Sequence, residues 1–168
     1  MIERLLRIRS IPSGRGSQAV SSIDHQHDCK IPALKLRADL IAPLMKQFLQ
    51  YSEHHKLTGG VHSAGLYTAT GEMLSFFDEI GRHNAVDKVI GDAFARNTPL
   101  HDKVLASTGR ISGEIVSKAL HAQLPAVISR SQPTSISIDL AKKYGLILIG
   151  RVRSLSFVVY NGIELLVA

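Results

Sequence analysis

The chain has little cysteine and few aromatic residues. Of its 168 residues, Cys29 is the single cysteine, tryptophan is absent and aromatic residues make up 5%. One cysteine excludes an internal disulfide and a cysteine-rich zinc or iron–sulfur site within one chain. Single-stranded nucleic acid is bound by stacking on exposed aromatic side chains, and their scarcity leads us to expect no nucleic-acid partner.

Long apolar runs are also missing. The longest, such as residues 146–150, are far shorter than the roughly 18–20 residues that cross a bilayer. The start of the chain has neither the apolar core nor the cleavage site of a signal peptide. We therefore expect a cytoplasmic protein with no membrane partner.

What is present is the composition of a globular domain with excess positive charge. Hydrophobic residues make up 45% and charged residues 20% of the chain, as in typical soluble proteins. Twenty Lys and Arg against fourteen Asp and Glu give a net charge of +6. This excess suits an anionic ligand such as a phosphorylated small molecule, although solubility alone would also account for it.

The pattern along the chain predicts an α/β fold. Residues 10–30 contain five Ser with Pro12, Gly14 and Gly16 and show little periodicity, so we expect a loop-rich segment over 1–36 and a domain over 37–168. Apolar periodicity predicts helices over 37–53, 85–94, 112–120 and 134–144, the last ending at Gly145. Strands are expected at 64–69, 73–77, 103–107, 126–129 and 146–149, with a final hairpin or edge pair formed by 157–160 and 164–167. This alternation predicts a layered mixed sheet with flanking helices.

Candidate binding residues collect in loops. In open α/β sheets, ligands bind beyond the carboxyl ends of strands, where loops lead into helices. A first loop runs from Thr58 to His62, and its adjacent Gly59 and Gly60 would let backbone N–H groups face an anion. A helix C-cap followed by a turn explains the same two glycines.

A second loop, residues 78–88, is crowded with charged side chains. Arg82 and His83 would add positive charge to the positive end of the following helix, which is unfavourable without an anion. A salt bridge from Asp78 or Glu79 to Arg82 is the structural alternative.

A third loop follows the strand at 103–107 and contains Thr108, Arg110 and Ser112. Its hydroxyls, backbone donors and guanidinium suit a phosphate or carboxylate, with Ser112 as the helix N-cap. An ordinary capped turn is the alternative. Lys118 is expected to pair with Glu114, one helical turn away.

Two further loops follow the later strands. Pro133 starts a helix shortly after Arg130. Arg151 and Arg153 are two residues apart on a segment expected to be extended, where their side chains would point the same way. The chain lacks both a G-x-x-x-x-G-K-[ST] loop and a G-x-G-x-x-G turn before a helix. The clusters His25-Gln26-His27-Asp28-Cys29 and His54-His55 are expected to be solvated or structural rather than metal ligands.

Five motifs, in this order, resemble the FdhD/NarQ family of formate dehydrogenase accessory sulfurtransferases. They are Thr58–Ala64, Gly81–Gly91, Gly109–Ser112 with Glu114 and Lys118, Pro133-Thr134, and Gly150 with Arg153. The resemblance implies a C-terminal domain similar to the cytidine deaminase fold. It also implies that sulfur passes from a cysteine desulfurase, as a persulfide on a loop cysteine, to the molybdenum bis(molybdopterin guanine dinucleotide) cofactor. That cofactor is then inserted into formate dehydrogenase.

The resemblance places residues 151–156 on the cofactor-binding surface. A GDP-like part of the cofactor would explain the basic, glycine-lined loops, and we also expect a homodimer. The residues expected to bind the cofactor are Thr58, Gly59, Gly60, His62, Gly81, Arg82, His83, Asn84, Thr108, Arg110, Ser112, Arg151, Val152, Arg153, Ser154, Leu155 and Ser156.

The chain departs from the family at the sulfur-carrying position. The family's cysteine loop aligns with Ser13-Gly14-Arg15-Gly16, so Arg15 stands where the cysteine is expected, and Cys29 matches no family cysteine. Persulfide chemistry needs a nucleophilic thiolate, which arginine cannot supply. We therefore name no catalytic residue, and a nucleotide- or phosphosugar-binding module without sulfur transfer is the alternative function.

Zinc chemistry is a third possibility, because deaminases share this kind of fold. It needs H-x-E followed by P-C-x-x-C, with the glutamate as acid and base. Here the corresponding helix starts with His83-Asn84-Ala85, and no cysteine pair follows. We therefore expect a cytidine deaminase-like fold without zinc.

Overall fold

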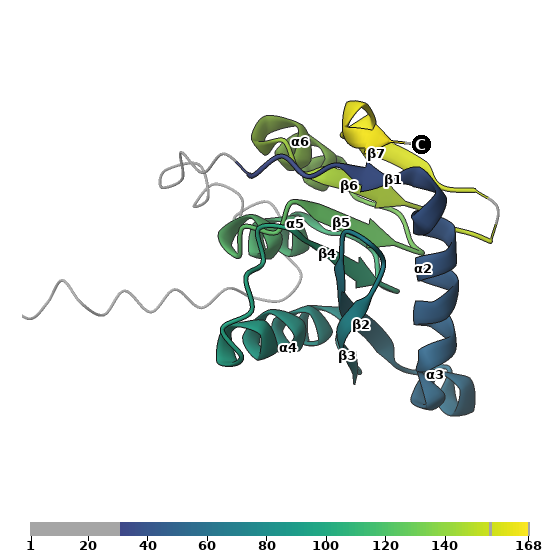
Figure 1. The fold of residues 1–168 in the computed structure, drawn as a ribbon. Coiled ribbons are helices and arrows are strands. Elements are labelled where there is room, and N and C mark those ends of the chain that lie inside the picture. The colour runs from purple at the N-terminus through teal and green to yellow at the C-terminus, as the bar shows by residue number, and fades with distance from the viewer. Residues whose placement is uncertain (1–30, 155, 168) are drawn as a thin grey trace, which may run out of the picture.

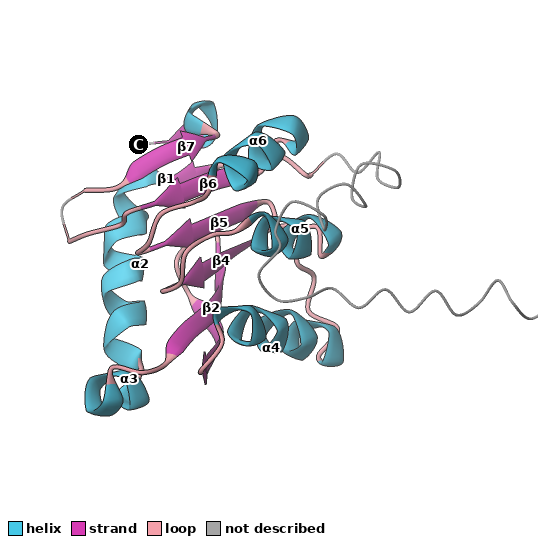
Figure 2. Ribbon diagram, turned by 180° about the vertical axis from the view of Figure 1, so that it is seen from behind, coloured by secondary structure: helices cyan, strands magenta, loops and turns pink. Residues whose placement is uncertain are grey.

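The computed structural model describes residues 31–154 and 156–167 as three layers. A mixed sheet forms the middle layer. Helix α2 (Ala38–Tyr51) covers one face, while α4 (Arg82–Ala95), α5 (Gly113–His121) and α6 (Ser135–Tyr144) cover the other (Figure 1 and Figure 2). The expected layered mixed sheet with flanking helices is confirmed.

The sheet has six strands in the order β3-β2-β4-β5-β6-β7. Their bounds are β2 His62–Thr68, β3 Met73–Glu79, β4 Lys103–Ser107, β5 Ala126–Ser129, β6 Ile147–Gly150 and β7 Val158–Asn161. Strands β4, β5 and β6 run parallel, whereas β2 runs antiparallel to β4 and pairs Ala64 with Ser107. The start of β2 and the ends of the three parallel strands therefore share one edge, the carboxyl edge of the sheet.

The helices on both faces form because each carries a stripe of apolar residues. On α2, the side chains of Ile41, Met45 and Phe48 are almost completely buried against one face of the sheet. On the other face, apolar residues of α4, α5 and α6 pack with the inward-facing residues of the strands. Helix α6 has the expected ends, since Thr134 Oγ1 accepts a hydrogen bond from Ser137 N–H and Gly145 closes the helix at a φ of 75°.

The helix expected over 37–53 is α2, and a short helix that the apolar pattern does not predict follows it. Helix α2 ends at Tyr51, and the short α3 (Glu53–Thr58) starts after Ser52. Ser52 adopts an extended conformation, and its Oγ accepts a hydrogen bond from His55 N–H at 2.9 Å. Because this is an N-cap, a serine inside an apparently continuous pattern begins a new helix here.

The hairpin expected at the C-terminal end is wrong. After β7, the chain turns at Gly162 (φ 85°) into a 3-10 turn, Ile163–Leu165, and then into β8, Leu166–Val167. Strand β8 pairs in parallel with β1, Leu36–Arg37, not with β7. The apolar pattern predicts extended chain correctly at 158–160 and 166–167, whereas residues 164 and 165 belong to the 3-10 turn. Such a pattern also does not name the pairing partner.

The expected Glu114–Lys118 pair is also wrong. Lys118 Nζ lies 2.6 Å from Asp87 Oδ1 on α4. Glu114 Oε2 instead lies 3.4 Å from His83 Nε2. Helices α4 and α5 pack side by side, so each charge meets a partner on the neighbouring helix. No helix in the described part of the chain is long and apolar enough to cross a membrane.

Candidate functional site

Loops from distant parts of the sequence meet at the carboxyl edge and enclose a basic cavity of about 370 Å³. They are the end of α3 with the start of β2, and the loops that follow β4, β5 and β6. The lining residues are His55, Gly59, Gly60, Val61, His62, Thr108, Arg130, Ser131, Gln132, Arg151 and Arg153. We call this space the basic cavity; none of the described residues that line it is acidic.

Buried hydroxyl groups hold the loops after β4 and β5. Ser129 Oγ donates to the carbonyl of Gly109 at 2.7 Å and accepts from Ser131 N–H at 3.0 Å. Ser107 Oγ accepts from Gly109 N–H at 3.1 Å. Because buried backbone groups need partners, these serines fix the turns that carry Thr108 and Ser131 into the cavity lining.

Three arginines from two loops line the basic cavity. Arg130 follows β5, and Arg151 and Arg153 follow β6. Arg151 has a φ of 53°, so this segment is not simply extended as expected. Arg151 N–H donates to Ser131 O at 2.8 Å, and Arg153 Nη1 donates to Arg130 O at 3.0 Å. The two loops are thereby tied together with their arginines on one cavity.

Gly150 allows the two arginine loops to approach. A Cβ atom at this position would lie 2.8 Å from the carbonyl oxygen of Ser131 and 3.0 Å from Pro133 Cδ. A backbone oxygen cannot swing aside as a flexible side chain does. The end of β6 therefore lies against the loop after β5 only with glycine at this position.

Residues 59–62, which we call the glycine wall, also line the basic cavity, but the amides of Gly59 and Gly60 are occupied. Gly59 closes α3 at a φ of 63°, and its N–H donates to His55 O at 2.9 Å. Gly60 N–H donates to Thr58 Oγ1 at 3.2 Å. The C-cap interpretation is therefore confirmed, and both amides donate within the chain. The glycines shape the wall, while donors for an anion come from side chains.

His62 lies in the basic cavity among positive charges. Burial lowers the pKa of His62, and the charges of Arg82, His55 and Arg110 lower it further. The imidazole is consequently uncharged at neutral pH, and the arginines supply the positive charge. His55 Nδ1 is 3.1 Å from the carbonyl oxygen of Val61, which joins α3 to the chain entering β2.

A second group of predicted residues lies where α4 and α5 begin. This helix-start cluster comprises Arg82, His83, Asn84, Arg110, Ser112 and Glu114, and none of them lines the basic cavity. Burial lowers the pKa of His83, and the charge of Arg82 adds to the shift. Arg82 packs on Gly109, where a Cβ atom would lie 2.8 Å from Arg82 Cβ.

The salt bridge proposed as an alternative for Arg82 is wrong. Asp78 accepts hydrogen bonds from Ser52 and Ser63, and Glu79 pairs with Lys88. Arg82 Nε and Ser112 Oγ are buried without a hydrogen-bond partner among the described residues. Ser112 occupies the N-cap position of α5, but its side chain makes no capping hydrogen bond.

A smaller apolar cavity of about 290 Å³ adjoins the basic cavity and shares Arg130 and Arg153 with it. Its other lining residues are Ala42, Met45, Lys46, Leu49, Gln50, Val152 and Ser154. Val152 is fully buried, and the carbonyl of Ser156 accepts from Arg153 N–H at 2.7 Å.

Of the residues predicted for the cofactor, the structure brings together Gly59, Gly60, His62, Thr108, Arg151 and Arg153. Gly81 is the N-cap of α4, outside this group. Leu155, Arg15 and Cys29 lie outside the described residues.

The sequence-based set missed Arg130, Ser131, Gln132, His55 and Val61. Arg130 to Gln132 directly follow β5 in a loop that the sequence analysis does single out, but the predicted cofactor-binding residues do not include them. Val61 likewise lies within the first candidate loop, Thr58 to His62, and is absent from that set.

No three His, Cys, Asp or Glu side chains in residues 31–154 and 156–167 are grouped to hold a metal ion. His54, which is 76% exposed, has its Nδ1 3.4 Å from Asp78 Oδ2. The cluster at residues 25–29 lies outside the described residues.

The profile of the FdhD/NarQ family matches residues 3–167. The chain belongs to the FdhD/NarQ family. Among curated FdhD/NarQ relatives, the sulfur carrier protein FdhD of Nocardia farcinica is 44% identical over 128 residues, which is 76% of this chain and 46% of the relative. The protein of the same name from Sulfurisphaera tokodaii is 38% identical over 128 residues, or 76% and 50% of the two chains.

A solved structure agrees with the family assignment. A protein from Desulfotalea psychrophila, described as a formate dehydrogenase accessory protein, matches with a TM-score of 0.76 and 28% identity. The match covers 82% of this chain and 61% of that protein. The present chain spans about half the length of the curated relatives it matches.

Proposed function

We propose that this FdhD/NarQ chain is an accessory protein of formate dehydrogenase that binds the guanine nucleotide part of the molybdenum bis(molybdopterin guanine dinucleotide) cofactor. One observation carries the proposal. Arg130, Arg151 and Arg153 line a single cavity, and no acidic residue lines it among the residues that the structure describes. The names of the relatives, sulfur carrier protein and formate dehydrogenase accessory protein, indicate which client such a cavity would serve.

The residues present fit a diphosphate. Guanidinium groups bind phosphate oxygens through paired, charge-assisted hydrogen bonds. The cavity also contains the hydroxyl-bearing residues Thr108 and Ser131 and the amide side chain of Gln132. We expect the arginines to hold the diphosphate while these neutral groups orient it. The cofactor is cargo, and the chain's role in this step is to bind and orient it.

Sulfur transfer would use different residues. In the family it depends on a thiol, and position 15 carries arginine in this chain. None of the described residues that line the basic cavity is a cysteine. We propose that nucleotide binding therefore needs no thiol, and that a cysteine desulfurase, if it acts with this chain, acts elsewhere than in the cavity.

The proposal has further parts that the same family supports. We propose a cytidine deaminase-like fold without zinc, because α4 and α5 begin at the carboxyl edge with arginine, histidine, glycine and serine instead of a cysteine pair. We also propose a homodimer in the cytoplasm. Elemental analysis of chelator-free protein and sedimentation would test these parts, and stoichiometric zinc or a monomer would contradict them.

Calorimetric titration of the whole chain with GDP tests the binding proposal. We expect GDP to bind more tightly than ADP or ribose 5-phosphate. Absence of GDP binding would overturn the proposal. Equal affinity for all three ligands would favour the alternative, a general nucleotide- or phosphosugar-binding module.

A further inference from the structure

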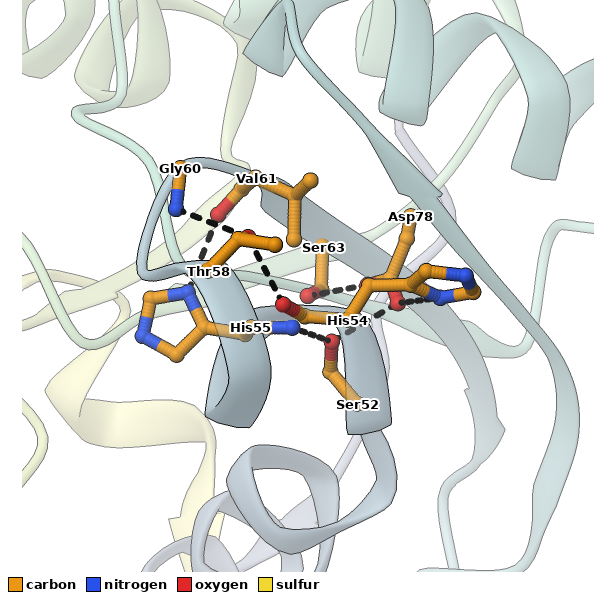
Figure 3. Close-up of polar contacts among 8 residues, drawn as sticks. All are labelled: Ser52, His54, His55, Thr58, Gly60, Val61, Ser63 and Asp78. Atoms are coloured by element: carbon orange, nitrogen blue, oxygen red, sulfur yellow. Dashed lines mark hydrogen bonds and ion pairs between the residues drawn. The ribbon is translucent and has the colours of Figure 1, made fainter.

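Asp78 connects the parts of the chain that form one side of the basic cavity. It lies on the edge strand β3, directly opposite Ser63 on β2. Its side chain is 14% exposed and accepts a hydrogen bond at each carboxylate oxygen. Ser63 Oγ donates to Oδ1 at 2.6 Å, and Ser52 Oγ donates to Oδ2 at 2.7 Å (Figure 3).

The hydrogen bond from Ser52 links Asp78 to α3, and through α3 to the glycine wall of the cavity. Ser52 is 2% exposed, and its Oγ also accepts from His55 N–H at the start of α3. Because the hydroxyl proton is donated to Asp78, the oxygen lone pairs remain available for this N-cap. Helix α3 is only six residues long and has no buried residues, so its position depends on its ends. Figure 3 shows the chain of contacts from Asp78 through Ser52 to α3 and on to Gly60.

The hydrogen bond to Ser63 reaches the strand side of the cavity. Ser63 N–H donates to Thr108 Oγ1 at 2.9 Å, and Thr108 N–H donates to Ser63 O at 3.1 Å. Thr108 and His62, the neighbour of Ser63, both line the cavity. One carboxylate therefore orients two separate segments that line the cavity, without lining the cavity itself.

We propose that Asp78 is a positioning residue for the anion site: it holds α3 and the start of β2 in the geometry that the ligand requires. The inference rests on the proposed function for the identity of the ligand. Because Asp78 is negatively charged, the positioning role and simple electrostatics predict opposite changes of nucleotide affinity in Asp78→Asn. A negative charge close to a basic cavity repels an anion, so electrostatics alone would have Asp78→Asn tighten nucleotide binding. If Asp78 instead positions α3 and the start of β2, the same substitution weakens nucleotide binding.

The test compares GDP affinity and hydrogen exchange in Asp78→Asn and Ser52→Ala. In Asp78→Asn, one amide oxygen cannot accept both hydroxyl protons with unchanged geometry. We expect GDP to bind about 10-fold more weakly, equivalent to about 1.4 kcal/mol. Amides of residues 53–60 should exchange faster, whereas those of β4 should not. Ser52→Ala should give a similar result, and combining both changes should add less than their sum.

Asp92→Asn is the matched control, because Asp92 is a 19% exposed carboxylate whose ion pair with Arg96 lies on α4. It should leave GDP binding unchanged. Unchanged or tighter GDP binding in Asp78→Asn, or faster exchange throughout the chain, would overturn the positioning role. If the unsubstituted chain bound no GDP, the proposed function would fail, and local exchange at residues 53–60 would still decide whether Asp78 holds α3.

Discussion

The carboxyl edge of the sheet carries two groups of positive charge that differ in their surroundings. In and around the helix-start cluster, acidic side chains lie among the basic ones: His83 faces Glu114 and Lys118 pairs with Asp87. Arg82 and Arg110 of this cluster form no ion pair with a described residue. In the basic cavity, Arg130, Arg151 and Arg153 are exposed, and none forms an ion pair with a described residue.

This difference indicates that the first group serves the packing of two helices and the second group serves ligand binding. A charge that is matched within the protein contributes to the junction of two helices. Three unmatched guanidinium groups on one cavity repel one another and attract an anion. The family motif G-R-H-N-A-V-D-K lies in and beside the first group, so the most recognisable sequence string marks the helix junction and not the cavity lining.

The strongest test of this comparison is Arg153→Ala. Arg153 lines the cavity and its Nη1 also holds the loop after β5 through the carbonyl of Arg130. A hydrogen bond to a charged group contributes about 1.5–3 kcal/mol, so GDP binding should weaken by roughly 10- to 100-fold. Calorimetric titration measures this. Unchanged GDP affinity in this variant would contradict the proposal that the basic cavity binds the nucleotide.

Gly109→Ala should destabilise the helix-start cluster, where α4 and α5 begin, and not the basic cavity. A Cβ atom at this position would lie 2.8 Å from Arg82 Cβ and 3.1 Å from Arg82 Cδ. Overpacking of this kind costs about 1–3 kcal/mol of stability, which denaturant unfolding detects. Gly91→Ala is the control, because a Cβ atom there meets nothing within 4 Å. Equal stability of the two variants would contradict the packing role of this junction.

The pH dependence of stability should involve one histidine from each of the two regions. Burial lowers the pKa of both His62 and His83, and the charge of Arg82 is the second cause in each case. The unfolded chain, with histidines near pKa 6.5, then binds more protons than the folded chain below that pH. Their neutral forms support full stability above about pH 6.5, and stability falls as the pH drops toward the lowered values.

Arg82→Gln checks this assignment. Removing the second cause should raise both histidine pKa values and flatten the pH dependence of the unfolding free energy between pH 7 and 5. NMR titration of the two imidazoles, compared with the unsubstituted chain, reports the shifts directly. A change confined to His83 would show that Arg82 acts within the helix-start cluster alone.

Arg110→Ala should have a smaller effect than Arg153→Ala. Sequence reasoning treated both as phosphate ligands because each follows a core strand, but Arg110 does not line the cavity. It acts on the cavity through its charge, which also lowers the pKa of His62. We expect GDP binding to weaken less than about 5-fold, or about 1 kcal/mol. Cys29→Ser should leave it unchanged. An Arg110 variant as weak as the Arg153 variant would show that the site extends to the helix-start cluster.

Most secondary structure followed from the sequence. The strands Lys103–Ser107 and Ala126–Ser129 have the predicted bounds, and α6 begins after Thr134 and ends at Gly145 as expected. These features depend on residues within a few positions of one another: buried apolar runs, a hydroxyl that caps an N-terminus, a glycine that permits a positive φ. The sequence alone therefore determined the layered α/β architecture and the loops in which polar groups collect.

Only the tertiary structure decided which of those groups meet. It paired β8 with β1, turned Lys118 toward Asp87 and placed Arg130 beside Arg153. It also showed that the amides of Gly59 and Gly60 are already bonded within the chain. Each of these contacts crosses between elements or depends on how a helix end closes. Packing of the helices on the sheet sets those distances, and local residue patterns do not contain them.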